Sequence, residues 1–416
     1  MIKRIIYTSD FLSFDIDVIK VHHYWVIDII SNLIEQASNI KIESIGNIGF
    51  RREDFFYKSG ISNIEKMYYL YDINSINNDS LRYLNEFINN ECLILGFELG
   101  CDITNIFNKL NITYINIAFH LFKLGEDLSF AINTNNKKIF EILLKYRLSS
   151  DYEYFHANYW KNYIKRVVQF DDSFLMDNSA ILISQNPIDI SVKKEKKFLS
   201  FIDFKDELEK LSKDYSKFYY CTRIDANIPK DILDYINSVN YIDIIYDIPT
   251  YYFLTSDKIK KVIGMSSSIL YEAKYFGKDV HYLYKQQIKI EDNFSIDNYV
   301  PINNNFYNPY FYSDILSPII DTNKNITNDI LFKNIQNRIR DMHSYFGYHY
   351  LDKIKNIENG ININITRINN NENIINVNSN KINAIINNVN CLINELSWWI
   401  PIKKLRDNFR NKFIIK

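Results

Sequence analysis

The chain has 416 residues, of which 47% are hydrophobic, enough material for two folded domains rather than a disordered chain. Its 49 basic and 50 acidic residues are mixed along the chain, so no global field attracts a polyanion, and nucleic acid is a poor candidate partner. The four cysteines have no CxxC spacing, which indicates neither a zinc site nor a disulfide framework and fits a reducing cytoplasm.

Residues 1–175 read as an α/β domain. KRIIYTSDFLSF predicts a buried strand that ends in a polar loop at Asp10, and VIKVHHYWVIDIISNLIEQA has the apolar spacing of a helix. Two further apolar runs, ECLILGFEL and ITYINIAF, end at Glu98 and His120. Open α/β sheets bind ligands at the carboxyl ends of their strands, so these three residues are candidate cleft residues, although ordinary loop residues fit the same pattern.

A second domain follows an aromatic helical connection at about 138–166. Strands and short helices alternate again over about 176–320, and the remaining residues, 321–416, form a C-terminal extension rich in Ile and Asn that suits an ordered hairpin or a mobile insert. Two α/β domains joined in this way predict the GT-B architecture, in which two Rossmann-like lobes face a cleft. A single large doubly wound sheet is the structural alternative.

Three serines open the helical run SSSILYEAKYFG. Ser266, Ser267 and Ser268 suit a helix start, where unpaired N–H groups and a partial positive charge can bind a phosphate without Lys or Arg. Glu272 lies one turn after Ser268 on the same helix. Taken alone, this acid also fits an ordinary solvated surface position.

Another polar cluster follows a predicted strand in ILISQNPIDISV. The strand stops at Gln185, Pro187 breaks the ladder, and Asp189 and Ser191 follow at its mouth. A carboxylate there can act as a nucleophile at a sugar anomeric centre or support its cationic transition state. Asp is also common in turns, so the pattern alone is weak. No DxD-type acid pair with a metal-binding loop context stands out, and we expect no metal.

Together, these two segments resemble the motif pair of bacterial retaining β-Kdo transferases that build capsule linkers and some O-antigens. Gln185, Asp189 and Ser191 match the strand-end motif GQ…D.S, and SSSILYEAKYFGKDV matches S(S/T)…(F/Y)EA…GK.V at a similar separation. The resemblance covers about 180–285, with a fainter echo in GFELG and AFHLFKLGEDLSFAINTN. It implies a GT-B enzyme that uses CMP-β-Kdo as donor, with no other cofactor.

The resemblance also implies roles for individual residues. Asp189 would be the nucleophile of a double displacement that preserves the β configuration, and Glu98 the acid/base on the acceptor side. Gln185 and Ser191 would bind the donor, while the serine helix and Glu272 would hold CMP, Glu272 through the ribose. His120 would be a cleft residue without a defined role.

One departure from the family pattern leaves the sugar open. Related enzymes often carry Lys-x-His-Pro after the next strand, whereas this chain reads KFYYCTRIDAN, with Arg223 at the position of the His. Arg can pair bidentately with a carboxylate or phosphate, and another CMP-linked ulosonic acid would present the same carboxylate. The alternatives are an inverting transferase of the CMP-sialic-acid type, with Asp189 or Glu98 as base, and a non-catalytic scaffold for polysaccharide assembly.

The end of the chain, NELSWWIPIKKLRDNFRNKFIIK, combines indoles with cations. Trp398 and Trp399 precede six basic residues, which are Lys403, Lys404, Arg406, Arg410, Lys412 and Lys416. This composition suits a membrane-surface anchor or, equally, a final helix that packs its tryptophans on the domain. No run of 18 apolar residues predicts a spanning helix. We therefore expect a cytoplasmic protein, with peripheral contact at the inner-membrane face left open, that acts on a lipid-linked or oligosaccharide acceptor.

Overall fold

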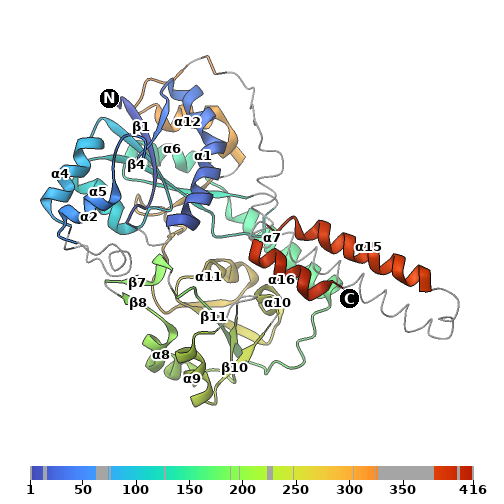
Figure 1. Cartoon of the computed structure of the whole chain (residues 1–416). Helices are drawn as coiled ribbons and strands as arrows, with labels where there is room; N and C mark the ends of the chain where they lie inside the picture. The colour runs from blue at the N-terminus through green and yellow to red at the C-terminus, as the bar shows by residue number, and fades with distance from the viewer. Residues whose placement is uncertain are drawn as a thin grey trace.

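The computed structural model describes residues 2–12, 16–61, 74, 76–125, 128–187, 189–195, 197–222, 228–246, 248–302, 304–323, 325–326, 379–400 and 403–414. These residues form two α/β lobes and a C-terminal pair of helices (Figure 1). The predicted fold class, α/β with two Rossmann-like lobes, is confirmed. Arg223 and the alternating stretch GININITRI lie outside the described residues.

The first lobe is built on a six-stranded sheet with the order β13-β5-β4-β3-β1-β2. Its strands are β1 (Arg4–Ser9), β2 (Ile42–Ser44), β3 (Cys92–Phe97), β4 (Thr113–Phe119), β5 (Phe130–Thr134) and β13 (Val300–Ile302). The first four run parallel, whereas β5 is antiparallel to both of its neighbours. Strand β3 is buried along its whole length, as a central parallel strand covered on both faces must be.

Helices cover both faces of this sheet. On one face lie α1 (Ile16–Ser38), α6 (Lys137–Leu143) and α12 (Pro309–Leu316), and on the other lie α2 (Arg52–Lys58), α4 (Asn78–Phe87) and α5 (Cys101–Lys109). The predicted helical connection is α6, the short turn η2 (Leu144–Tyr146), α7 (Ser150–Tyr163) and the π-turn η3 (Ile164–Val168).

The second lobe contains a five-stranded, fully parallel sheet with the order β10-β9-β6-β11-β12. Its strands are β6 (Ser179–Ile183), β9 (Phe218–Cys221), β10 (Ile242–Ile245), β11 (Ile259–Gly264) and β12 (Asp279–Tyr282). Strands β9 and β10 lie on one side of β6, and the later strands β11 and β12 lie on the other. The strand order therefore reverses between β6 and β11. Ligands of doubly wound sheets bind at such a switch point, outside the carboxyl ends of the strands.

Short helices and one hairpin complete the second lobe. They are η4 (Ile190–Val192), the hairpin of β7 (Lys193–Lys194) and β8 (Lys197–Phe198), η5 (Phe201–Phe204), α8 (Lys205–Ser212), α9 (Lys230–Ser238), α10 (Thr250–Thr255), α11 (Ser268–Ala273) and η6 (Lys274–Phe276). Side chains of α8 and α9 pack on one face of the sheet, and those of α10, α11 and α7 on the other.

After the second lobe, the chain returns to the first. The predicted second domain extended to residue 320, but β13 pairs with β5, and α12 packs on α1 in the first lobe. The short helix η7 (Asn304–Tyr307) connects them, and its Phe306 ring stacks on Phe130 of β5 at 4.0 Å between centroids. The return covers an edge strand that would otherwise leave its backbone groups unpaired.

The C-terminal extension ends in two helices, α15 (Ser379–Ser397) and α16 (Lys403–Phe413), that contact each other (red in Figure 1). Part of the Ile/Asn-rich text, SNKINAIINNVN, is therefore helical rather than a hairpin. Its apolar residues recur three and four positions apart, which is a helical spacing. No helix in the part of the chain that the structure describes is long and apolar enough to cross a membrane.

We expect Phe306→Ala to lower the free energy of unfolding by about 3–5 kcal/mol, since it removes a buried ring and leaves a cavity against Phe130. Urea unfolding followed by circular dichroism measures the change. Phe155→Ala, at an exposed position on α7, is the matched control, with an expected change within about 0.5 kcal/mol. Equal effects of the two substitutions would contradict the packed return of the chain.

Candidate active site

A hydrogen-bonded cluster forms at the carboxyl end of β6. Gln185 Nε2 donates to Asp189 Oδ2 at 2.9 Å, and the Ser191 backbone N–H donates to Asp189 Oδ1 at 2.8 Å. The backbone N–H of Asp189 itself donates to Asn186 O at 3.2 Å, which closes the turn. The three residues of the predicted strand-end motif are thus brought together, with one donor on each oxygen of the Asp189 carboxylate.

The second predicted motif meets the first at the switch point. Ser191 Oγ and Ser266 Oγ are 2.5 Å apart although 75 residues separate them in the chain. They meet because β6 and β11 are neighbouring parallel strands with Leu182 opposite Ile263, so both motifs leave the sheet at the same edge.

The serine helix is shorter than its sequence suggests. Helix α11 begins at Ser268 and has six residues, with Ser267 at its N-cap, and η6 continues it to Phe276. The N-cap side chain makes no capping hydrogen bond to the described backbone. The apolar residues of α11 are buried in a cluster that contains side chains of both lobes, and this burial fixes the position of the helix start. A role in phosphate binding stays a prediction.

Glu272 is fully buried and connects the two lobes. Its Oε1 accepts a hydrogen bond from the Lys123 backbone N–H at 2.6 Å, and its Oε2 accepts one from the Tyr251 hydroxyl at 2.8 Å. Burial raises the pKa of Glu272 to about 7, against the opposing effect of these donors. It is therefore not a solvated surface acid, and protein donors already engage both of its oxygens. The ribose contact stays a prediction.

Lys123 is a buried cation that sequence reasoning missed. It lies in the loop after β4, and its Nζ donates to the His120 carbonyl. Burial lowers the pKa of Lys123 to about 8, while the charges of Glu98 and Glu272 act to raise it. One ammonium group thus lies near two carboxyl groups, one from each lobe. A lysine within the apolar run AFHLFKL was the available signal, because lysine is almost never fully buried unless it is paired.

Glu98 occupies a strained position at the end of β3. Its φ is +48°, in the left-handed region that costs a non-glycine residue about 1 kcal/mol or more, and its N–H donates to Ile117 O at 2.8 Å. The Asn116 side chain holds the next residue, Leu99, through both backbone groups at 2.9 and 3.0 Å. Burial raises the pKa of Glu98; Lys123 lowers it and Asp189 raises it further. The two candidate catalytic carboxyls, one from each lobe, thus act on each other electrostatically.

His120 and Asp10 are both buried. His120 Nε2 is 3.5 Å from Glu153 Oε1, its ring meets Tyr271 edge-on, and burial lowers its pKa to about 3, so the imidazole is neutral. Asp10 accepts backbone hydrogen bonds from Leu12 at 2.9 Å and Gly100 at 2.8 Å. These contacts make Asp10 a support for the loop that carries Glu98. The structure gives His120 a place between the lobes, where Glu153 and Tyr271 meet.

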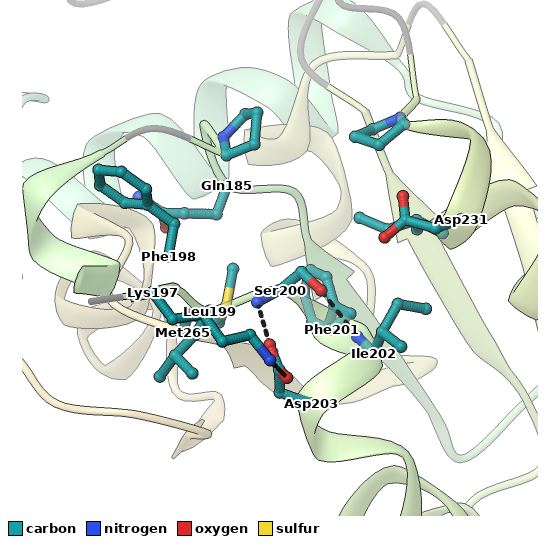
Figure 2. A pocket seen from close by; sticks show the side chains of 13 residues that line it. Gln185, Lys197, Phe198, Leu199, Ser200, Phe201, Ile202, Asp203, Asp231 and Met265 are labelled. Carbon is teal, nitrogen blue, oxygen red and sulfur yellow. Dashed lines mark hydrogen bonds and ion pairs between the residues drawn. The ribbon is translucent and has the colours of Figure 1, made fainter. Parts of the chain in front are cut away.

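A cavity of about 340 Å³ opens beside the Asp189 cluster in the second lobe (Figure 2). Its lining combines strand-end residues with the β8–η5 segment and the start of α9, and consists of Gln185, Pro187, Lys197, Phe198, Leu199, Ser200, Phe201, Ile202, Asp203, Pro229, Asp231, Ile232 and Met265. Sequence reasoning named Gln185 and Pro187 among them, Pro187 only as the residue that ends the strand. Most of the others lie in turn-like segments with no distinctive motif, so no sequence signal separated them from ordinary loops.

Some polar side chains along the cavity wall already form hydrogen bonds or ion pairs with neighbouring residues. Ser200 and Asp203 form a capping box at the start of η5, and Lys197 pairs with Asp203. Gln185 and Asp231 lie on different sides of the cavity in Figure 2. Among the described residues, no group of three His, Cys, Asp or Glu side chains is placed to hold a metal ion.

Comparisons with known proteins give only distant likenesses. No family model matches the chain, and no curated protein matches its sequence. Among solved structures, the β-Kdo 2,7 transferase of KpsC from Thermosulfurimonas dismutans has a TM-score of 0.31 and 13% identity over 58% of this chain and 81% of its own. The β-Kdo 2,4 transferase of the same protein has a TM-score of 0.29 and 10% identity over 54% and 78%.

A third likeness is to UDP-GlcNAc 2-epimerase from Neisseria meningitidis bound to UDP-GlcNAc, with a TM-score of 0.25 and 13% identity over 70% of this chain and 84% of the epimerase. The fold is GT-B-like. Both lobes have Rossmann-like sheets: the sheet of the second lobe is fully parallel, and four adjacent strands of the first sheet are parallel.

The buried Glu272 carboxyl, which connects the two lobes, predicts that the stability of the protein depends on pH. Because the pKa of Glu272 is raised to about 7 in the folded protein, the folded state keeps its proton longer than the unfolded state does, and this group makes stability fall as pH rises from about 4.5 to about 7. Glu272→Gln keeps an acceptor for Lys123 and cannot ionise. Urea titrations at several pH values are expected to show a flatter profile for this variant.

Glu272→Ala is the companion variant. It leaves the Lys123 N–H and the Tyr251 hydroxyl without their acceptor, with an expected loss of about 1–3 kcal/mol below pH 4.5 and a smaller loss as pH rises toward 7. A Glu272→Gln profile as steep as that of the wild type would contradict the raised pKa.

Proposed function

We propose that the protein is a retaining β-Kdo transferase that moves Kdo from CMP-β-Kdo to a glycan acceptor in the synthesis of a bacterial surface polysaccharide, such as a capsule, a lipopolysaccharide or an O-antigen. The observation that carries the proposal is the pair of carboxyl groups from two lobes. Gln185 and Ser191 orient Asp189, and the charge of Asp189 acts to raise the pKa of Glu98.

The two carboxyl groups have different surroundings, and this difference suits different roles. Two donors orient Asp189, and one of them, Gln185, also lines the cavity, an arrangement that suits a nucleophile. Burial raises the pKa of Glu98, which makes it a better proton acceptor than an exposed glutamate. In glycoside chemistry, two carboxyl groups with different surroundings often take different roles, one as nucleophile and the other as acid or base.

In the proposed first step, an Asp189 oxygen attacks the anomeric carbon of Kdo while the bond from that carbon to the CMP phosphate oxygen breaks and CMP leaves. In the second step, Glu98 takes the proton of an acceptor hydroxyl as its oxygen attacks the anomeric carbon and the bond to Asp189 breaks. Each step inverts the configuration, so the product retains that of the donor. No metal takes part in this proposal.

The donor would occupy the cavity beside Gln185, with its phosphate toward the Ser191 and Ser266 hydroxyls at the switch point. Arg223, which lies outside the described residues, is proposed to pair with an anionic group of the donor. A ribose contact of Glu272 requires an arrangement in which Lys123 or Tyr251 has released the carboxylate. The acceptor, a lipid-linked or free oligosaccharide, would approach from the Glu98 side.

Intact-mass measurement after incubation with CMP-Kdo tests the nucleophile. In Glu98→Gln the second step is slowed, so we expect one Kdo to accumulate covalently on the protein, and peptide mapping to place it on Asp189. The double variant Glu98→Gln/Asp189→Asn is expected to show no adduct. Adding Asp243→Asn, an exposed acid on β10, to Glu98→Gln is the matched control and is expected to leave the adduct in place.

Other outcomes would replace the proposal. CMP release from CMP-sialic acid but not from CMP-Kdo, without any adduct, would identify an inverting transferase. A folded wild-type protein that releases CMP from neither donor would favour the scaffold. An adduct that persists in the double variant would remove Asp189 from the role of nucleophile.

The pH profile tests the role of Glu98. The Kdo adduct is broken down only when its base is ionised, so the raised pKa of Glu98 places the acid limb of kcat for donor hydrolysis above the usual glutamate value near 4.5. Activity therefore falls as pH is lowered through the raised pKa. Glu98→Gln is expected to abolish this limb and lower kcat by about 10²–10⁴-fold. Glu91→Gln, on the surface of the same lobe, should leave the profile unchanged.

A further inference from the structure

The C-terminal helices present indole side chains to solvent. Trp398 and Trp399, at the end of α15, are 68% and 47% exposed, whereas Trp25 and Trp160 are 7% and 3% exposed in the body of the protein. The tryptophans of this segment therefore do not serve as packing groups on the domain, which was one of the two expectations from sequence. Exposed apolar side chains that gather in one place mark an interaction surface.

Two arginines lie over one of these exposed indoles, that of Trp398. The guanidinium of Arg406 lies 4.9 Å and that of Arg410 5.4 Å from the centre of the Trp398 ring. Arg410 Nε also donates to Ser397 Oγ at 2.7 Å, which joins α16 to the end of α15. These contacts hold the indole in place at the surface. Contacts within the helix pair therefore fix the orientation of the Trp398 indole.

Helix α16 itself has two distinct kinds of side chain. It carries five basic residues and one acid, Asp407, in a chain whose charges are otherwise balanced. Leu405, Phe409 and Phe413 recur every four positions and form an apolar stripe, and the two Phe rings are 5.0 Å apart. None of the residues of α16 is buried. A helix with a basic face, an apolar stripe and adjacent indoles suits the plane of a membrane interface.

We propose that the α15–α16 pair, through Trp398, Trp399 and the basic face of α16, is a docking surface for an anionic lipid bilayer. The indoles enter the headgroup zone, the apolar stripe lies along the interface, and the lysines and arginines face the anionic lipids. An acidic protein partner would satisfy the cations, but the combination of an apolar stripe along the helix and two exposed indoles favours a lipid surface. The proposal stands independently of the proposed enzymatic activity.

Tryptophan fluorescence tests the docking directly on the full-length protein. With phosphatidylglycerol vesicles we expect a blue shift of the emission, because two of the four tryptophans move from water into the interface. Trp398→Phe/Trp399→Phe keeps only the buried Trp25 and Trp160 and is expected to show no shift. Flotation of the same mixtures measures binding itself, and circular dichroism confirms that the variants remain folded.

A charge-reversal variant measures the electrostatic contribution to vesicle binding. Lys403→Glu/Lys404→Glu, at the start of α16, is expected to lower the affinity for phosphatidylglycerol vesicles at least about tenfold, and added salt should weaken the wild type similarly. Lys137→Glu/Lys138→Glu reverses two neighbouring exposed lysines at the start of α6 and is the matched control, with unchanged binding expected.

Several results would overturn the proposal. Equal binding to phosphatidylcholine and phosphatidylglycerol vesicles would remove the role of charge, and no binding to either by the folded protein would remove the docking surface. Concentration-dependent dimers in light scattering that the Trp398→Phe/Trp399→Phe variant abolishes, without vesicle binding, would assign the surface to a second copy of the chain.

Discussion

The Glu272 carboxylate lies where the two lobes meet, and the relation of the lobes depends on how it is satisfied. A carboxyl group removed from water is costly unless it is hydrogen-bonded. Here one oxygen accepts a hydrogen bond from the Lys123 N–H of the first lobe, and the other accepts one from the Tyr251 hydroxyl of the second. Apolar side chains from both lobes pack around this link, including Leu121 and Phe122 from the loop of Lys123. The hydrophobic contacts are not directional, so the buried carboxyl specifies which backbone group of the loop meets α11.

The loop that carries Lys123 also connects the Glu272 hydrogen bonds to the candidate catalytic residue Glu98. Lys123 lies near both Glu272 and Glu98, so a cation from the first lobe acts on an acid from each side. Glu98 is itself held in a left-handed conformation, with Asn116 and Asp10 supporting the chain that follows it. Strain of this kind persists only where the surroundings over-determine it. Glu98 therefore extends from a backbone that its neighbours hold in place.

The second lobe contributes its groups through topology. Since the strand order reverses between β6 and β11, the segments that follow these strands open on one crevice, where Ser191 meets Ser266 and Gln185 holds Asp189. The cavity beside Gln185 has its remaining walls in the β8–η5 segment and the start of α9 (Figure 2). One edge of a parallel sheet thus supplies both a carboxylate and a volume that can receive a ligand.

The sequence by itself determined the local elements and what ends them. Apolar periodicity gave the strands, so Glu98, His120 and Asp189 could be placed at strand ends, and two separated motifs could be expected to share one crevice. Contacts between distant positions decided the rest. The link from Glu272 to Lys123 spans 149 residues, β13 leaves the second lobe to complete the first sheet, and Trp398 is exposed at the end of α15. Burial, ionisation and edge pairing depend on which residues lie nearby in space, and side-chain spacing along the chain does not encode this.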